Sequence, residues 1–196
     1  FNERIVKNIM VPRNKISAAS QDSTSEAFLE QITQDGYSRI PIYKEDIDQI
    51  VGIIHTKDVL PILVKGQTLE LASIIRKPYF IPETKKINEL MTEFQLKRIQ
   101  IAIVLDEFGA TAGMVTLEDI VEEFVEYTKV VVDALSDKVT YWMTINEPQL
   151  VAGFGYLNGT HAPFVKEPEN LKVVTRNIML CHGRAVQTIR EFAKLS

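Results

Sequence analysis

The chain repeats itself at a spacing of 61 residues. Residues 40–60 align without gaps with residues 101–121, and the two copies place Gly52 opposite Gly113. Each copy reads as a short apolar strand, a five-residue turn, a second apolar strand that ends in a polar residue, and a helix. Because an internal repeat defines the folding unit, we expect two copies of one small α/β unit.

A helical stretch precedes each copy. Apolar residues recur at helical spacing within residues 27–32 and again within residues 87–94. With a short strand before that helix, each unit reads strand–helix–strand–strand–helix, a mixed α/β (α+β) pattern. A unit of about 60 residues buries little core alone. We therefore expect the two units, residues 1–63 and 64–124, to pack together.

The end of each copy carries a motif that resembles one of a known protein family. Tandem copies that end in Gly-x-x-(Thr/Ser)-x-x-Asp resemble a pair of CBS domains. Further motifs resemble those of the CorC/HlyC haemolysin-like transporter family, and they follow one another in order along residues 1–124. The matching motifs are Asn8–Arg13, Tyr37–Tyr43, Asp106–Gly109 and Val115–Glu123.

The resemblance implies a regulatory role rather than a catalytic one. In that family the pair is cytosolic, follows a membrane domain, is associated with transport of divalent cations (mainly magnesium) and binds adenine nucleotides. It therefore implies ATP, ADP or AMP as ligand, with or without magnesium, a homodimer of CBS pairs, and a membrane transport domain in the parent protein. The net charge of -4 argues against nucleic acid, which needs a basic face.

The residues themselves are compatible with an anion site at the end of the second copy. Thr116 and Asp119 are three apart where a strand enters a helix, and a helix N-terminus favours an anion. Thr116 can donate to a phosphate, and Asp119 can accept from ribose hydroxyls. Alternatively, Thr116 is a helix cap and Asp119 a first-turn acid. Candidates to sandwich the adenine are Tyr79, Phe80, Ile81, Gln100, Ile101 and Ala102.

The first copy departs from the pattern. His55 stands where the second copy has Thr116, and Asp58 corresponds to Asp119. This puts phosphate binding there in doubt, although His55 can still donate one hydrogen bond. Arg13 and Arg39 are each expected at the surface or in an ion pair rather than at a ligand, and Arg39 is the better phosphate candidate of the two. No metal site is expected, because His55 has no other histidine or cysteine in this half.

Residues 125–196 follow a different pattern. Two amphipathic helices are expected, one near residues 124–135 and a long one at the end of the chain, with a strand at residues 138–145 between them. This α-β-α segment resembles the family 1 glycoside hydrolases (β-glucosidases and 6-phospho-β-glucosidases). The matching stretches are residues 137–148, Gly155–Tyr156, Thr160–Pro163 and His182–Val186.

That second resemblance implies only one of the two carboxylates that catalysis would need. Glu147 would be the acid/base and Asn146 would bond the sugar's 2-hydroxyl. Retaining hydrolysis also needs a second carboxylate about 5 Å away, and the chain holds no matching Glu-Asn-Gly motif. A (β/α)8 barrel needs roughly 200 residues. We therefore interpret residues 125–196 as an incomplete barrel fragment fused to the pair near residue 124. The alternatives are a β-glucosidase fragment with activity, and one mixed domain matching by chance.

Overall fold

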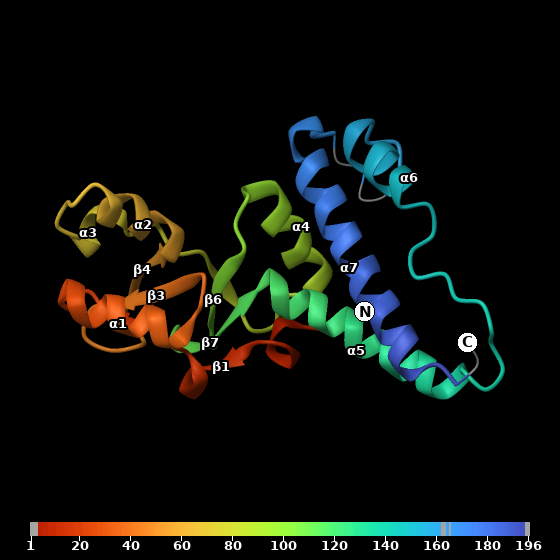
Figure 1. Ribbon diagram of the computed structural model, residues 1–196, viewed down its shortest axis with the longest axis horizontal. Coiled ribbons are helices and arrows are strands. Elements are labelled where there is room, and N and C mark those ends of the chain that lie inside the picture. Colours follow the sequence, from red (N-terminus) through yellow and green to blue (C-terminus); the bar gives the residue numbers. More distant parts are fainter. Residues whose placement is uncertain (1–3, 162–163, 165, 195–196) are drawn as a thin grey trace. The chain divides into compact units, whose positions relative to one another are not determined.

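The computed structural model describes residues 4–161, 164 and 166–194 (Figure 1). It divides into two compact units. The first unit comprises Phe1–Asn88 and Gln100–Thr116, and the second comprises Glu89–Ile99 and Leu117–Ser196. Of the hydrolase-like motifs, Ala162 and Pro163 lie outside the described residues.

The first repeat forms a three-stranded sheet with strand order β2-β3-β4. Strands β2 and β3 are parallel, and β3 and β4 form an antiparallel hairpin. A helix crosses from β2 to β3, so the predicted order of elements is confirmed. The elements are β2 (Ala19–Ser20), α1 (Ser25–Asp35), β3 (Arg39–Tyr43), β4 (Ile50–His55), α2 (Thr56–Val64) and α3 (Leu71–Ile74).

The second repeat has the same order of elements. Its sheet has four strands in the order β1-β7-β6-β5, with β5 parallel to β6 and β6 antiparallel to β7. The elements are β5 (Phe80–Pro82), α4 (Ile87–Lys97), β6 (Ile101–Leu105), β7 (Thr111–Thr116) and α5 (Leu117–Leu135), and the added strand is β1 (Val11–Pro12).

The first repeat has its own apolar core. Phe28 of α1 is fully buried against the inward residues of the sheet, among them Ile40, Ile42 and Ile54. Thr24 caps α1 by accepting a hydrogen bond from the Ala27 N–H at 3.2 Å.

A second cluster joins the two sheets. Ile50 and Ile53 of β4 contact Ile101 and Ile103 of β6. These residues stand in both repeats, so their shared burial confirms that the two copies pack together. Burial of four such side chains contributes roughly 1.5–3 kcal/mol each.

Each sheet is completed by the segment that precedes the other repeat. Strand β1 lies before the first repeat and pairs with β7 of the second, with Val11 opposite Met114. Reciprocally, Arg76 lies before the second repeat and bridges to Ile53 of the first, with two backbone hydrogen bonds of 2.9 Å. The repeats are thus interlocked by an exchange of flanking segments.

The two equivalent glycines allow these exchanged segments to approach. A Cβ atom on Gly52 would lie 2.1 Å from Ile75 Cγ2 and 2.8 Å from the Arg76 carbonyl oxygen. A Cβ atom on Gly113 would lie 2.5 Å from the Val11 carbonyl oxygen. The repeat therefore carries glycine at this position because another backbone passes directly over it.

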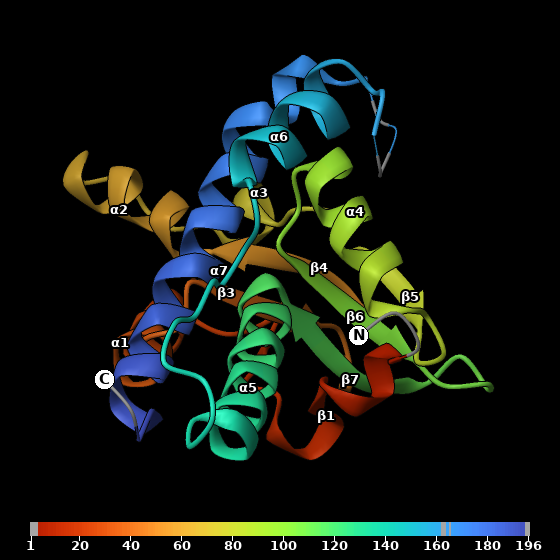
Figure 2. The same ribbon diagram turned by 90° about the vertical axis from the view of Figure 1, so that its right-hand side faces the viewer.

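The second unit is helical. Helix α7 (Leu171–Phe192), the predicted long closing helix, lies beside α5 in Figures 1 and 2. Helix α5 runs unbroken through residues 124 and 125. Between these helices lie α6 (Pro148–Ala152), a π-helical turn at Gly153–Leu157, and a 3-10 turn at Pro168–Asn170.

The second unit has a small core of its own. Tyr156 and Val174 are buried together with Ala152. The Tyr156 hydroxyl donates a 2.5 Å hydrogen bond to the buried amide oxygen of Gln95 on α4. This burial raises the pKa of Tyr156.

The strand predicted at residues 138–145 is wrong. Within the described part of the chain, residues 138–147 form neither a strand nor a helix. The physical reason is that a barrel strand is held by hydrogen bonds to two parallel neighbours, and both sheets here are made by the repeats. The α-β-α piece is therefore helices joined by an extended connection, and the sheets are open rather than closed into a barrel.

Candidate functional site

The strand-to-helix junction of the second repeat carries the predicted polar pair. Thr116 is the last residue of β7, opposite Ile101 in the sheet, and Asp119 lies in the first turn of α5. Both are half-buried. The first N–H groups of a helix have no acceptor within the helix. The junction thus combines a hydroxyl, backbone donors and a carboxylate, the groups that can bind a phosphate and a ribose.

The six adenine candidates divide by burial. The side chains of Ile81, Ile101 and Ala102 are at most 5% exposed and belong to the core. Tyr79 and Gln100 are half-buried, and Phe80 is 43% exposed at the start of β5. Of the six candidates, these three have side-chain surface that a base could contact without rearrangement of the core.

Two of the predicted residues contact each other across the repeats. The Arg39 guanidinium donates from Nη2 to Gln100 Oε1. Arg39 immediately precedes the buried residues of β3, and Gln100 immediately precedes those of β6. The two residues are 61 positions apart, which is the spacing of the repeat. The contact therefore joins equivalent positions of the two copies and places Arg39 against the edge of the second repeat.

The first repeat gathers a charged cluster around His55, the last residue of β4. Arg39 lies opposite His55 in the sheet. Burial lowers the pKa of His55 below its usual 6.5, and the positive charges of Arg76 and Arg39 lower it further. His55 is therefore a neutral hydrogen-bonding group at neutral pH.

Asp58 is already engaged in this cluster. Its Oδ2 accepts from Arg76 at 2.9 Å (Nε) and 2.6 Å (Nη2). The first repeat thus presents a carboxylate that an arginine already holds. Arg76 was not identified from the sequence, because it lies outside the repeated motif. It reaches Asp58 because the segment before the second repeat crosses to the first repeat.

Arg13 forms the expected ion pair. Its guanidinium contacts Asp48 in the turn between β3 and β4, and Asp48 also accepts from the Thr111 N–H at 2.9 Å. Arg13 additionally reaches the Thr111 carbonyl at 3.4 Å. This network ties the turn of the first repeat to the start of β7.

The described residues show neither a metal cluster nor a membrane span. Among them, no group of three or more His, Cys, Asp or Glu side chains is placed to hold a metal ion. None of their helices combines the length and apolarity needed to cross a bilayer.

The hydrolase-like residues lie in a different setting from that of a barrel. Asn146 and Glu147 are exposed. Glu147 immediately precedes α6 with a φ of 43°, so it lies at the start of a five-residue helix. Glu147 therefore does not lie at the end of a strand, because the strand predicted at residues 138–145 does not form.

Two family models match the chain. The CBS domain model matches residues 6–65, which include the first repeat. The Glycosyl hydrolase family 1 model matches residues 90–195. That match begins in α4 of the second repeat and extends over the antiparallel β6–β7 hairpin, where a barrel would have parallel strands.

Relatives with known names match the repeat pair. The magnesium and cobalt efflux protein CorC of Escherichia coli (strain K12) is 36% identical over 118 residues, which are 60% of this chain and 40% of that protein. The chain spans only 29–40% of the length of the curated relatives it matches.

Solved structures share the fold. The CBS domain of a bacterial CNNM/CorC family Mg2+ transporter in complex with ATP is 41% identical, with a TM-score of 0.57, over 62% of this chain and 87% of that one. A CBS-domain pair with bound AMP from Klebsiella pneumoniae is 27% identical, with a TM-score of 0.56, over 62% of this chain and 98% of that one. With two interlocked repeats of this kind, the chain belongs to the CBS-domain family, as a tandem pair of the CorC/CNNM type.

Proposed function

We propose that the CBS pair of this chain is a regulatory module that binds an adenine nucleotide at the second repeat. The observation that carries the proposal is the intact Thr116-x-x-Asp119 motif at the junction of β7 and α5. The 41% identity to a CBS domain solved with ATP supports it. ATP, ADP and AMP are the candidate ligands, with or without magnesium.

Each residue of the motif has a separate task in this proposal. The Thr116 hydroxyl and the first N–H groups of α5 bind phosphate oxygens. The Asp119 carboxylate accepts hydrogen bonds from the two ribose hydroxyls. Tyr79 and Phe80 provide apolar and aromatic surface for the base, because the apolar candidates Ile81, Ile101 and Ala102 are core residues.

The first repeat is the weaker site. The Asp58 carboxylate accepts two hydrogen bonds from Arg76, so a ribose would have to displace the guanidinium. His55 provides one neutral donor where the second repeat has a hydroxyl. Because His55 stands in place of the threonine hydroxyl, we assign tight binding to the second repeat.

The parent protein supplies the context for regulation. Relatives named as efflux proteins and transporters support a role of such a pair beside ion transport. We propose that this pair forms a homodimer at the cytosolic face of the membrane and passes a nucleotide-dependent change to a transport domain. The chain itself would not be an enzyme.

Titration calorimetry on the full chain tests the nucleotide site. ATP, ADP and AMP are titrated separately, each with and without Mg2+. Asp119→Asn should weaken binding at least tenfold, since it removes charge-assisted acceptors worth about 1.5–3 kcal/mol. The matched variant Asp58→Asn should change the affinity less than threefold. Absence of heat with all three nucleotides, or equal losses in the two variants, would overturn the proposal.

A further inference from the structure

Helix α5, which begins at the proposed nucleotide site, is strongly acidic. Its residues 117–135 contain six carboxylates and one lysine, so the helix carries a net charge of -5. Five of the six carboxylates lie within residues 118–126, the half nearest the site. The favourable effect of a helix N-terminus on negative charge falls off within the first turn. Carboxylates beyond that turn therefore repel the phosphates of a nucleotide bound at the start of α5.

Helix α7 carries the opposite charge and lies beside this acidic helix (Figures 1 and 2). Its residues 171–192 contain four basic side chains and one carboxylate, a net charge of +3 with histidine counted as neutral. The Arg184 guanidinium donates from Nη2 to Glu122 Oε1, and Lys129 Nζ lies 4.7 Å from the centroid of the Phe192 ring. Because both contacts advance along both helices, α5 and α7 run parallel. Arg184 thus lies beside the part of α5 that is nearer the site.

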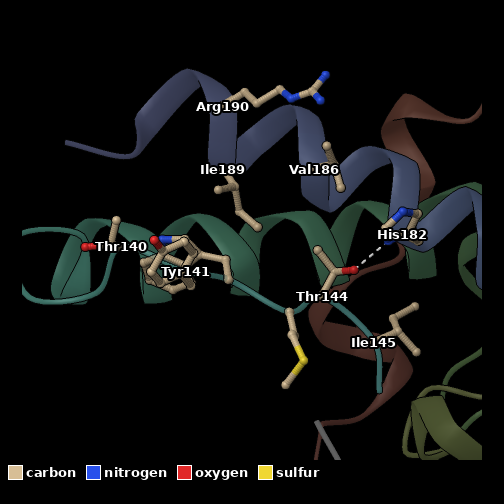
Figure 3. A pocket seen from close by; sticks show the side chains of 10 residues that line it. Thr140, Tyr141, Thr144, Ile145, His182, Val186, Ile189 and Arg190 are labelled. Carbon is tan, nitrogen blue, oxygen red and sulfur yellow. Dashed lines mark hydrogen bonds between the residues drawn. The ribbon is translucent and has the colours of Figure 1, made fainter. Parts of the chain in front are cut away.

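Packing fixes α7 at this position. Val132 of α5 and Ala185 of α7 are fully buried, as is expected where two helices pack against each other. The connection between α5 and α6 also holds α7, because Thr144 Oγ1 and His182 Nδ1 lie 2.6 Å apart and share a hydrogen bond (Figure 3). Arg184 is therefore presented to α5 by a helix that is held from two neighbouring segments.

The ion pair with Arg184 lies close to the proposed site. Glu122 follows Asp119 by three residues, so the two carboxylates are neighbours on one face of α5. At 1.5 Å per residue, Glu122 lies about 8 Å along the helix axis from Leu117, where the helix begins. This distance is within the screening length of about 10 Å at 0.1 M salt. The charge of Glu122 is therefore felt at the start of α5 unless a cation neutralises it.

We propose that Arg184 of α7 raises the affinity of the nucleotide site by neutralising Glu122. The proposal rests on the proposed function, and it makes the C-terminal helix a charge regulator of that site. Arg184 acts through its charge and does not touch the nucleotide. Because ATP carries about two more negative charges than AMP, the effect on ATP is the larger one.

Titration calorimetry of the full chain with ATP and with AMP tests this role. At about 0.1 M salt, Arg184→Gln should weaken ATP binding about threefold and AMP binding less than about twofold. Both losses should vanish at about 1 M salt, where the screening length falls to about 3 Å. The double variant Arg184→Gln with Glu122→Gln should bind ATP as the original chain does, because the two charges are removed together.

The matched control is Arg190→Gln, which removes the same charge from the same helix. Arg190 lies about 9 Å further along the axis of α7 than Arg184, and its guanidinium points away from Thr144 (Figure 3). This variant should change the ATP affinity by less than about 1.5-fold.

The outcomes separate this proposal from the proposed function. Equal losses for ATP and AMP, a double variant as weak as Arg184→Gln, or an equal loss in Arg190→Gln would overturn the role of Arg184 and leave nucleotide binding in place. Unchanged affinities in Arg184→Gln would do the same. Absence of binding by the original chain would overturn the proposed function together with this proposal.

Discussion

Replacing Gly52 with alanine should destabilise the first unit, because another backbone crosses directly over this position. The new Cβ would lie 2.1 Å from Ile75 Cγ2 and 2.8 Å from the Arg76 carbonyl oxygen. Real Cβ atoms do not approach other atoms so closely, so the crossing segment must move away. The Ile75 side chain can rotate, but the Arg76 carbonyl belongs to the bridge that joins the repeats.

The magnitude follows from the contacts that must change. Insertion of a methyl group into a packed site costs about 1–3 kcal/mol. Movement of Arg76 also strains two backbone hydrogen bonds with Ile53, each 2.9 Å long, and a net hydrogen bond contributes roughly 0.5–1.5 kcal/mol. We therefore expect Gly52→Ala to lower the free energy of unfolding by about 2–5 kcal/mol.

Urea unfolding followed by circular dichroism measures this loss. The matched control is Gly183→Ala in α7, where an added Cβ would meet no atom within 4 Å, and it should gain about 0.5–1 kcal/mol because alanine replaces glycine inside a helix. A loss below about 0.5 kcal/mol for Gly52→Ala, with the slope against urea unchanged, would refute the argument from close approach.

Three further substitutions test other parts of the structure. Tyr156→Phe should cost about 1–3 kcal/mol of unfolding free energy, because it leaves the buried Gln95 amide oxygen without its donor; an unchanged urea midpoint would contradict that bond. Asp48→Ala should cost roughly 1–2 kcal/mol, discounted for its partial exposure, by removing the acceptor of the Thr111 N–H; thermal denaturation measures it, and addition of salt should not abolish the loss. The lowered pKa of His55 means that the unfolded chain binds more protons than the folded one, so stability should fall as the pH falls below its usual value of 6.5. His55→Gln should flatten that fall between about pH 7 and pH 5, and an identical pH profile for both proteins would contradict the assignment.

The repeat made most of the first unit predictable. The order of strands and helices could be read from local patterns of apolar residues. Because the same pattern occurs twice, the assignment in one copy supports the assignment in the other. The contact between Arg39 and Gln100 was also open to prediction, because a repeat that packs on itself brings equivalent positions together. The bond from Arg76 to Asp58 was not, because the order in which flanking segments cross between sheets leaves no local signal.

The strand predicted at residues 138–145 shows where sequence pattern fails. Its residues have the composition of a barrel strand, but the burial of their side chains alternates only over residues 141–144. A strand is completed by its neighbours rather than by its own residues, and among the described residues no strand pairs with this segment. The same reason removes Glu147 from the setting in which its motif would be catalytic.

The exchange of flanking segments also has a consequence for synthesis. Val11 pairs with Met114, so the ribosome adds about a hundred residues between the two partners. At typical rates of about 5–20 residues per second, the N-terminal segment waits roughly 5–20 seconds before its sheet exists. The first repeat can collapse around Phe28 in that interval, while Val11 and Pro12 stay exposed on the nascent chain. The order of events in translation thus makes closure of β1 onto β7 a late step in building the pair.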